Sequence, residues 1–135
     1  MVEKTLIALG LALFFCGLVS GVLIPMMKLP RMGVTSHLEG TANGTFLVVV
    51  GLIWSHLHLG DLWLAIASVC LIWGAWANWG ATQLSAIWGT GKLTPIASGG
   101  ATGSKTHEGI VTAMLYGVAV TDFVGVAILI VGILR

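Results

Sequence analysis

Charged residues are scarce in this 135-residue sequence, where they make up 8% of the chain, against about 25% in an ordinary soluble domain. Hydrophobic residues make up 57%. A soluble protein of this size cannot cover its surface with so few charges, so a lipid bilayer is the expected solvent. The net charge of +1 gives neither the excess of basic residues that a nucleic-acid-binding protein needs nor an acidic tail.

Cysteine is also scarce. Cys16 and Cys70 both lie inside apolar runs. Their number and placement exclude a disulfide scaffold and a zinc site built on paired cysteines. The high hydrophobic content likewise excludes a disordered chain.

The few charged residues divide the chain into four long apolar runs. Each run exceeds the ~20 residues that an α-helix needs to cross a hydrocarbon core of ~30 Å. The sequence therefore predicts an all-α membrane protein with a single four-helix transmembrane domain over residues 1–135. The expected spans are residues 5–25, 37–57, 62–88 and 108–134.

The basic residues indicate an orientation. An even number of spans places both termini on one side, where only Lys4 and Arg135 carry basic side chains. Four basic residues fall in the first and third connections: Lys28, Arg31, Lys92 and Lys105. By the positive-inside rule we expect an integral protein of the bacterial inner membrane with both connections in the cytoplasm. The glycine-rich segment 99–106 lacks the strand and lysine context of a phosphate loop, which favours a flexible linker.

The third span has a polar stripe and an aromatic face. At about 100° per residue, one stripe collects polar or small residues: Gly74, Asn78, Thr82, Ser85 and Gly89. Trp73, Trp76 and Trp79 occupy the opposite sectors. Such a stripe forms interhelical hydrogen bonds or lines a ligand cavity, and we favour the cavity.

The fourth span carries a carboxylate near mid-membrane depth. Asp122 shares a face with Glu108 and Thr112, and Tyr116 lies on the edge of that face. An ionised carboxylate there costs several kcal/mol unless it is paired or hydrated. Because no Lys or Arg lies at matching depth, we favour a functional over a structural role for Asp122.

The second span offers two different polar faces. Ser36-x-x-Glu39 has the spacing of a capping box, which would place His37 in the first helical turn. Small residues share the face of His37 and predict a floor on which a flat ring can lie: Gly40, Thr41, Gly44, Val48 and Gly51. Asn43 points about 120° away from His37 and has Glu39 one turn before it. The two faces cannot easily serve one pocket within a subunit, but they can serve adjacent pockets in a ring of identical subunits.

Glycine spacing predicts close helix packing. Gly17-x-x-x-Gly21 and Gly40-x-x-x-Gly44 both allow two helices to approach. The other histidines are less informative. For His56 and His58 we favour a short turn at the membrane interface over a metal site. For His107 the sequence allows two roles, a helix cap or a site residue.

Two short motifs resemble a known family. Ser36-His37 followed by Asn43-Gly44 resembles the second helix of styrene oxide isomerase, and Trp76-Ala77-Asn78 looks like that family's Trp-Ser-Asn. In length and span pattern the chain looks like the family's shorter members, the hydroxylaminobenzene mutases. The resemblance covers all four spans.

The resemblance implies a homotrimer with haem b between neighbouring subunits. In it His37 matches the axial haem ligand, while Asn43 and Asn78 match pocket-lining asparagines. Thr82 stands where the isomerase has a pocket tyrosine, which argues against epoxide isomerisation. Tyr116 and Asp122 are the candidates to replace that tyrosine.

The implied reaction is a redox-neutral step of nitroaromatic degradation, from hydroxylaminobenzene to 2-aminophenol, with ferric haem as Lewis acid. Trp73, Trp76 and Trp79 would flank the aromatic ring, and Asn43 and Asn78 would orient its NHOH group. Arg31, Lys28 or Lys92 would pair with the haem propionates.

Four alternatives stay open. A styrene-oxide-type epoxide isomerase belongs to the same family. A small four-helix transporter needs a carboxylate in its first span, where this chain has only Glu3 at the edge. An electron-transfer cytochrome subunit usually needs two axial histidines, and only His37 and His107 share a side. A purely structural subunit leaves Asp122 unexplained.

Overall fold

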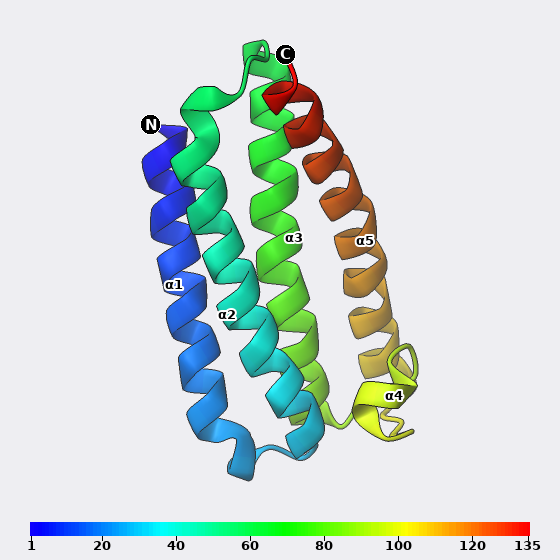
Figure 1. Ribbon diagram of the computed structural model, residues 1–135. Helices are drawn as coiled ribbons and strands as arrows, with labels where there is room; N and C mark the ends of the chain where they lie inside the picture. Colours follow the sequence, from blue (N-terminus) through cyan, green and yellow to red (C-terminus); the bar gives the residue numbers. More distant parts are fainter.

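The computed structural model describes residues 1–135 and contains helices without strands (Figure 1). Four helices are long and apolar enough to cross a membrane: α1 (Val2–Leu23), α2 (Pro30–Ile53), α3 (Asp61–Trp88) and α5 (Lys105–Ile133). The short elements are η1 (Ile24–Met26), η2 (Trp54–His56) and α4 (Pro95–Ser98). The predicted all-α fold with four spans is confirmed.

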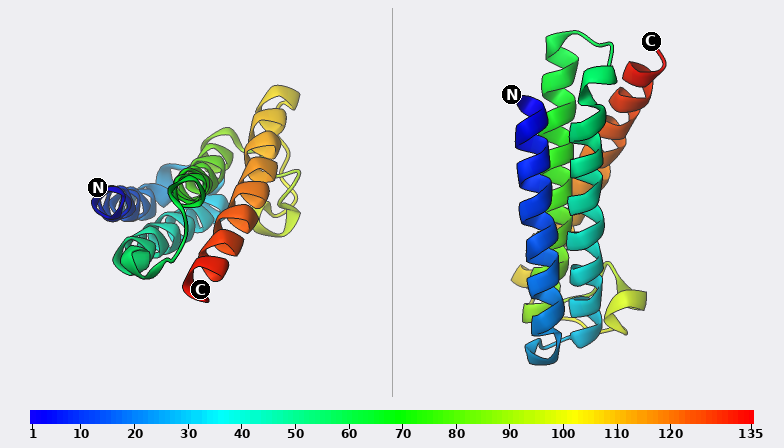
Figure 2. Two further views of the ribbon diagram at one scale, coloured as in Figure 1. Left: turned by 90° about the horizontal axis from the view of Figure 1, so that it is seen from above. Right: turned by 60° about the vertical axis from the view of Figure 1, so that its left-hand side comes forward.

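Helices α1, α2 and α3 pack together, and α5 lies along the outer side of α3 (Figure 2). The two chain ends lie at the same end of the bundle (Figure 1). Fully buried leucines from α1, α2 and α3, such as Leu13, Leu47 and Leu71, form the apolar core. The side of α5 turned away from α3 stays exposed, and Phe123 there is 80% accessible.

Glycines bring α1 and α2 into backbone contact. A Cβ atom at Gly40 would lie 2.5 Å from the Cα of Gly17, and one at Gly44 would lie 2.5 Å from the backbone nitrogen of Phe14. No side chain fits at either position unless the helices separate. The close approach expected from the glycine spacing is therefore present, with Gly40 and Gly44 facing α1.

The start of α2 differs from the prediction. The helix begins at Pro30, whose ring fixes the backbone angle that a first helical residue needs. His37 and Glu39 consequently lie inside the helix and not in its first turn. The predicted capping box of Ser36 and Glu39 is wrong, because neither residue is at a helix end.

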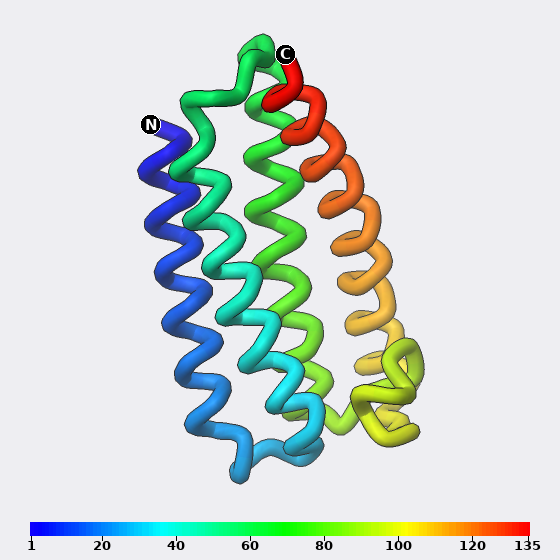
Figure 3. Tube along the Cα trace, in the orientation of Figure 1, coloured from blue at the N-terminus to red at the C-terminus, as the bar shows by residue number.

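The connection between α3 and α5 is folded around one buried carboxylate. Glu108, 8% exposed, accepts hydrogen bonds from the backbone nitrogens of Gly91 (3.1 Å), Lys92 (3.1 Å) and Gly103 (2.7 Å). Arg31 of α2 donates to the carbonyl of Ile96 in α4 at 3.3 Å. Figure 3 shows this connection as a compact coil of chain at one end of α5. The expectation of a flexible linker is wrong, because Glu108 supplies the acceptors that the backbone needs.

The glycine contacts generate a stability prediction. Gly44→Ala should lower the free energy of unfolding by about 1–3 kcal/mol, because its methyl group overpacks the backbone of α1. Gly109→Ala is the matched control, since nothing lies within 4 Å of a Cβ atom at that position. Unfolding of both variants in mixed detergent micelles, followed by circular dichroism, checks the difference. Equal stability of the two variants would contradict the packing described here.

Candidate functional site

A carboxylate joins the two predicted asparagines. The Oε2 atom of Glu39 accepts hydrogen bonds from Nδ2 of Asn43 at 3.1 Å and from Nδ2 of Asn78 at 2.7 Å. All three side chains are half-buried. The sequence predicted both asparagines as site residues but assigned Glu39 to a helix cap. The four-residue spacing of Glu39 and Asn43 was a visible signal, whereas the bond to Asn78 crosses between helices.

Asp122 lies next to this cluster, which we call the Glu39 cluster. Its carboxyl group packs over Gly74, one helical turn before Asn78, in the space that a side chain at Gly74 would take. Its carboxyl group is half-buried and makes no hydrogen bond within the chain. Tyr116 does not join the cluster, because it is 62% exposed on the surface of α5.

His37 points toward α1, away from the Glu39 cluster. Its Nδ1 atom lies 2.9 Å from the carbonyl oxygen of Gly17. Since a carbonyl only accepts, Nδ1 carries a hydrogen, and in the neutral ring Nε2 then carries the lone pair. Gly21 leaves room for the ring, because a Cβ atom there would lie 2.7 Å from Nδ1. The two polar faces predicted for the second span therefore point toward different helices.

The environment of His37 fits a metal ligand. Nε2 makes no hydrogen bond in the chain and is not enclosed by it. Metal-binding histidines typically donate their other ring nitrogen to a carbonyl or carboxylate, which fixes the tautomer and orients the ring. His37 and Gly17 have this arrangement, so the residues present are compatible with an axial histidine.

The predicted floor beneath His37 is not open. The backbone of α1 fills the space above Gly40 and Gly44. The Thr41 hydroxyl donates back to its own helix, to the carbonyls of His37 (2.9 Å) and Leu38 (3.1 Å). The expectation that a flat ring lies on these residues is wrong within one chain, because helix packing uses them. A group bound at Nε2 would lie outside the α1–α2 pair.

The three tryptophans do not surround one ring. Trp79 is held inside the bundle, where its Nε1 donates to Ser20 at 3.1 Å, and its ring meets Trp76 edge to face with centroids 5.9 Å apart. Trp73 packs over Gly117 of α5 and, together with Trp76, lines a hollow of about 700 Å³. Two of the three tryptophans thus share a pocket within one chain, and Trp79 does not line it. The buried Nε1 of Trp76 has no hydrogen-bond partner.

Thr82 turns toward its own helix. Its hydroxyl lies 3.1 Å from the carbonyl of Asn78 and 2.9 Å from that of Trp79, and the side chain is buried. A hydroxyl satisfied in this way is not presented to a ligand. The structure therefore does not support the prediction that Thr82 lines a pocket.

A second polar network was not predicted. Gln83 of α3 accepts at Oε1 from Ser20 of α1 (2.8 Å) and Ser36 of α2 (2.7 Å). This network joins three helices. Sequence reasoning missed Gln83 because it lies off the polar stripe of the third span.

The remaining histidines have structural surroundings. His107 stacks on Trp88 with ring centroids 4.1 Å apart, and Ser104 caps the helix by accepting from the backbone of His107. His56 and His58 lie in the turn between α2 and α3, and no cluster of three metal-ligating side chains is present.

The basic residues suggested for propionates lie at the end of the bundle nearer His37. Arg31 holds the carbonyl of Ile96, and Lys28 donates to the carbonyl of Trp88 at 3.2 Å, both at the surface. Lys92 is exposed.

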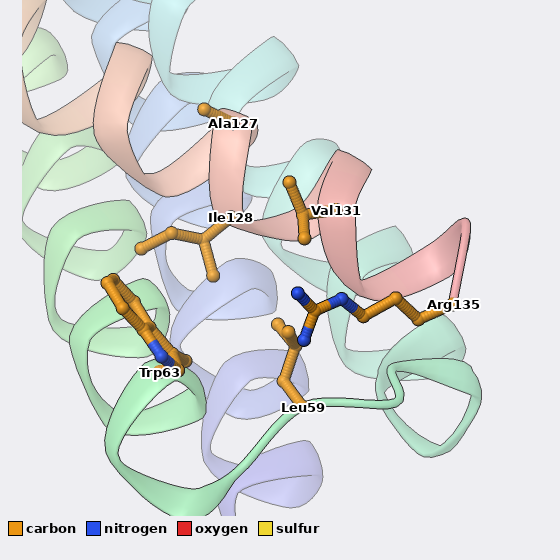
Figure 4. Close-up of a pocket in the computed structure, with 6 residues that line it drawn as sticks. All are labelled: Leu59, Trp63, Ala127, Ile128, Val131 and Arg135. Carbon is orange, nitrogen blue, oxygen red and sulfur yellow. The ribbon is translucent and has the colours of Figure 1, made fainter.

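A further pocket contains none of these residues. It measures about 270 Å³ and lies between α3 and α5 near the chain ends (Figure 4). Its lining is Leu59, Trp63, Ala127, Ile128, Val131 and Arg135. It contains none of the predicted site residues and lacks converging polar groups, so it is not the candidate site.

Comparisons with known proteins agree with the motif analysis. A family model described as styrene oxide isomerase matches residues 2–134. The chain belongs to this family. It is 46% identical to hydroxylaminobenzene mutase HabA of Ectopseudomonas oleovorans over 98% of this chain and 99% of that protein. It is 42% identical to hydroxylaminobenzene mutase HabB of the same organism over 96% of this chain and 80% of that protein. No solved structure gives a significant match.

The resemblance drawn from Ser36–Gly44 and Trp76–Asn78 is thereby confirmed. Mutases are isomerases, so the prediction that this family member is an enzyme of the isomerase class is also confirmed.

Proposed function

We propose that this protein converts hydroxylaminobenzene to 2-aminophenol by moving the hydroxyl group within the molecule. The observation that carries the proposal is the Glu39 cluster, in which two amides and a carboxylate converge inside an apolar four-helix chain. The names of two relatives with more than 40% identity supply the substrate. Thr82, whose hydroxyl is satisfied by its own helix, makes epoxide isomerisation the weaker candidate.

The rearrangement needs no net electrons. The N–O bond breaks, a C–O bond forms at the ortho carbon, and the ring proton lost there balances the one gained at nitrogen. Breaking the N–O bond leaves positive charge on the nitrogen and ring. An apolar site keeps bulk water from capturing that cation. Asn43 and Asn78 orient the NHOH group in this scheme.

We propose haem b as the cofactor, which His37 would hold through its iron and Arg31, Lys28 or Lys92 would hold through its propionates. When bound, ferric haem supplies a Lewis acid for the substrate oxygen. The Gly17 carbonyl fixes the tautomer of His37 and leaves Nε2 free for iron.

The two faces of α2 support a homotrimer in this proposal. His37 and the Glu39 cluster face different helices, so one pocket would take the histidine of one subunit and the asparagines of its neighbour. The basic residues of the first and third connections favour the cytoplasmic side of the bacterial inner membrane for that end.

Conversion of hydroxylaminobenzene by the purified protein tests the proposed function. The detergent-solubilised protein should form 2-aminophenol without nicotinamide or flavin, because substrate and product are isomers. In water enriched in oxygen-18, mass spectrometry should find no label in the product. A requirement for added NADH, or label from solvent in 2-aminophenol, would overturn the intramolecular reaction.

His37→Ala should abolish haem binding, because no other histidine has a free Nε2 beside the same helix pair. Absorbance of the Soret band per protein, measured after purification with haem supplied, checks the loss. His56→Ala and His58→Ala are the controls and should keep full haem content. Normal haem content in His37→Ala would remove His37 as the ligand.

Asp122→Asn should lower turnover per haem while the protein folds as well or better. A half-buried carboxylate without a cation disfavours folding, and asparagine keeps its shape without the charge. Each tenfold loss of rate corresponds to about 1.4 kcal/mol of transition-state stabilisation. Thermal melting and turnover are to be measured on the same preparations. A variant that melts much earlier yet keeps its turnover would show that Asp122 serves only the packing of the helices.

A further inference from the structure

One carboxylate oxygen controls the orientation of two amides. Oε2 of Glu39 accepts from the Nδ2 atoms of both Asn43 and Asn78, on two different helices. The Oδ1 atoms of the two amides have no hydrogen-bond partner in the chain, and they are not enclosed by it. The unpaired acceptors of the two amides are therefore their carbonyl oxygens.

The orientation follows from electrostatics. An amide side chain presents a donor at one end and an acceptor at the other, and rotation by half a turn exchanges them. Rotation of Asn43 or Asn78 would place a carbonyl oxygen against the Glu39 carboxylate, where two acceptors repel. Each amide keeps a second N–H, but its direction is fixed by the same bond. Asp122, the other polar group beside the cluster, is also an acceptor when ionised.

We propose that Glu39 is a positioning residue that holds Asn43 and Asn78 with their carbonyl oxygens toward the substrate, so that the site selects ligands carrying hydrogen-bond donors. This inference rests on the proposed function and specifies the chemistry of its substrate. An aromatic hydroxylamine offers an N–H and an O–H, which match two carbonyl acceptors. An epoxide offers only an acceptor oxygen, which cannot form a hydrogen bond with the two carbonyl oxygens.

A matched pair of unreactive ligands tests the proposal. Benzyl alcohol has an O–H donor on an aromatic framework of similar size, and benzyl methyl ether has only the acceptor oxygen. Their dissociation constants are to be measured by calorimetry on the holoprotein in detergent, and their inhibition constants against hydroxylaminobenzene. The wild type should bind the alcohol about fivefold more tightly than the ether or better, as expected for one net hydrogen bond.

Substitutions at Glu39 should change this ratio. In Glu39→Leu the amides are free to rotate, and the ratio should fall to about one at normal haem content. Glu39→Gln is the matched control, because its one carbonyl oxygen can take the place of Oε2 and accept from both amides, so it should keep a ratio near that of the wild type. Glu39→Met has a similar length but no oxygen acceptor, so its ratio should fall as in Glu39→Leu. Asp61→Asn, an exposed carboxylate at the start of α3, is the control and should keep the wild-type ratio.

The outcomes separate this inference from the proposed function. A folded Glu39→Leu or Glu39→Met variant with the wild-type ratio would overturn the positioning role, and so would a wild type that does not prefer the alcohol. If Glu39→Leu fails to fold, Glu39→Met decides the question. Absence of 2-aminophenol from the wild type would overturn the proposed function while the binding ratio still reports the orientation of the amides. A purely structural role of Glu39 would weaken both ligands equally and leave their ratio unchanged.

Discussion

The polar groups of this protein depend on one constraint, which is that hydrocarbon offers them no partner. Each polar atom inside a membrane span must find its hydrogen bond within the protein or lose several kcal/mol. Glu39 satisfies the constraint with two amides, and Gln83 does so with two serines. Both arrangements connect neighbouring helices. The hydrogen bonds that offset the cost of burying these polar groups therefore also fix the register of α2 against α3.

Backbone packing sets where the histidine can act. Because Gly40 and Gly44 let α1 touch α2, the carbonyl of Gly17 comes within 2.9 Å of the His37 ring. A wider separation of the two helices would leave Nδ1 without that acceptor and the tautomer undetermined. The glycines therefore contribute to the site by bringing a backbone carbonyl to the ring, although they do not provide an open floor for a ligand.

Local periodicity carried much of the correct prediction. The four apolar runs indicated the spans, and the angular separation of His37 and Asn43 on one helix indicated two faces. The predictions that failed depended on which helices pack against each other, and the periodicity of a single helix does not contain that information. Trp79 lies inside the bundle, where its Nε1 donates to the hydroxyl of Ser20 on α1. The pattern of one helix does not predict such an interhelical hydrogen bond. The start of α2 at Pro30 was missed because the spacing of Ser36 and Glu39 matched a capping box, whereas the helix begins about two turns earlier at a proline that fits its first position.

Helix α5 is fastened mainly at its ends. At one end Glu108 binds three backbone nitrogens of the preceding connection, and at the other the backbone nitrogen of His58 donates to the carbonyl of Gly132 at 2.9 Å. Between these points α5 rests on α3 through side chains seated on Gly117 and Gly125, without an interhelical hydrogen bond. Between its two ends, α5 is therefore held to α3 by side-chain packing alone. Asp122 lies on this central section, so its carboxyl group is positioned by its contact with Gly74 and not by a hydrogen bond of its own.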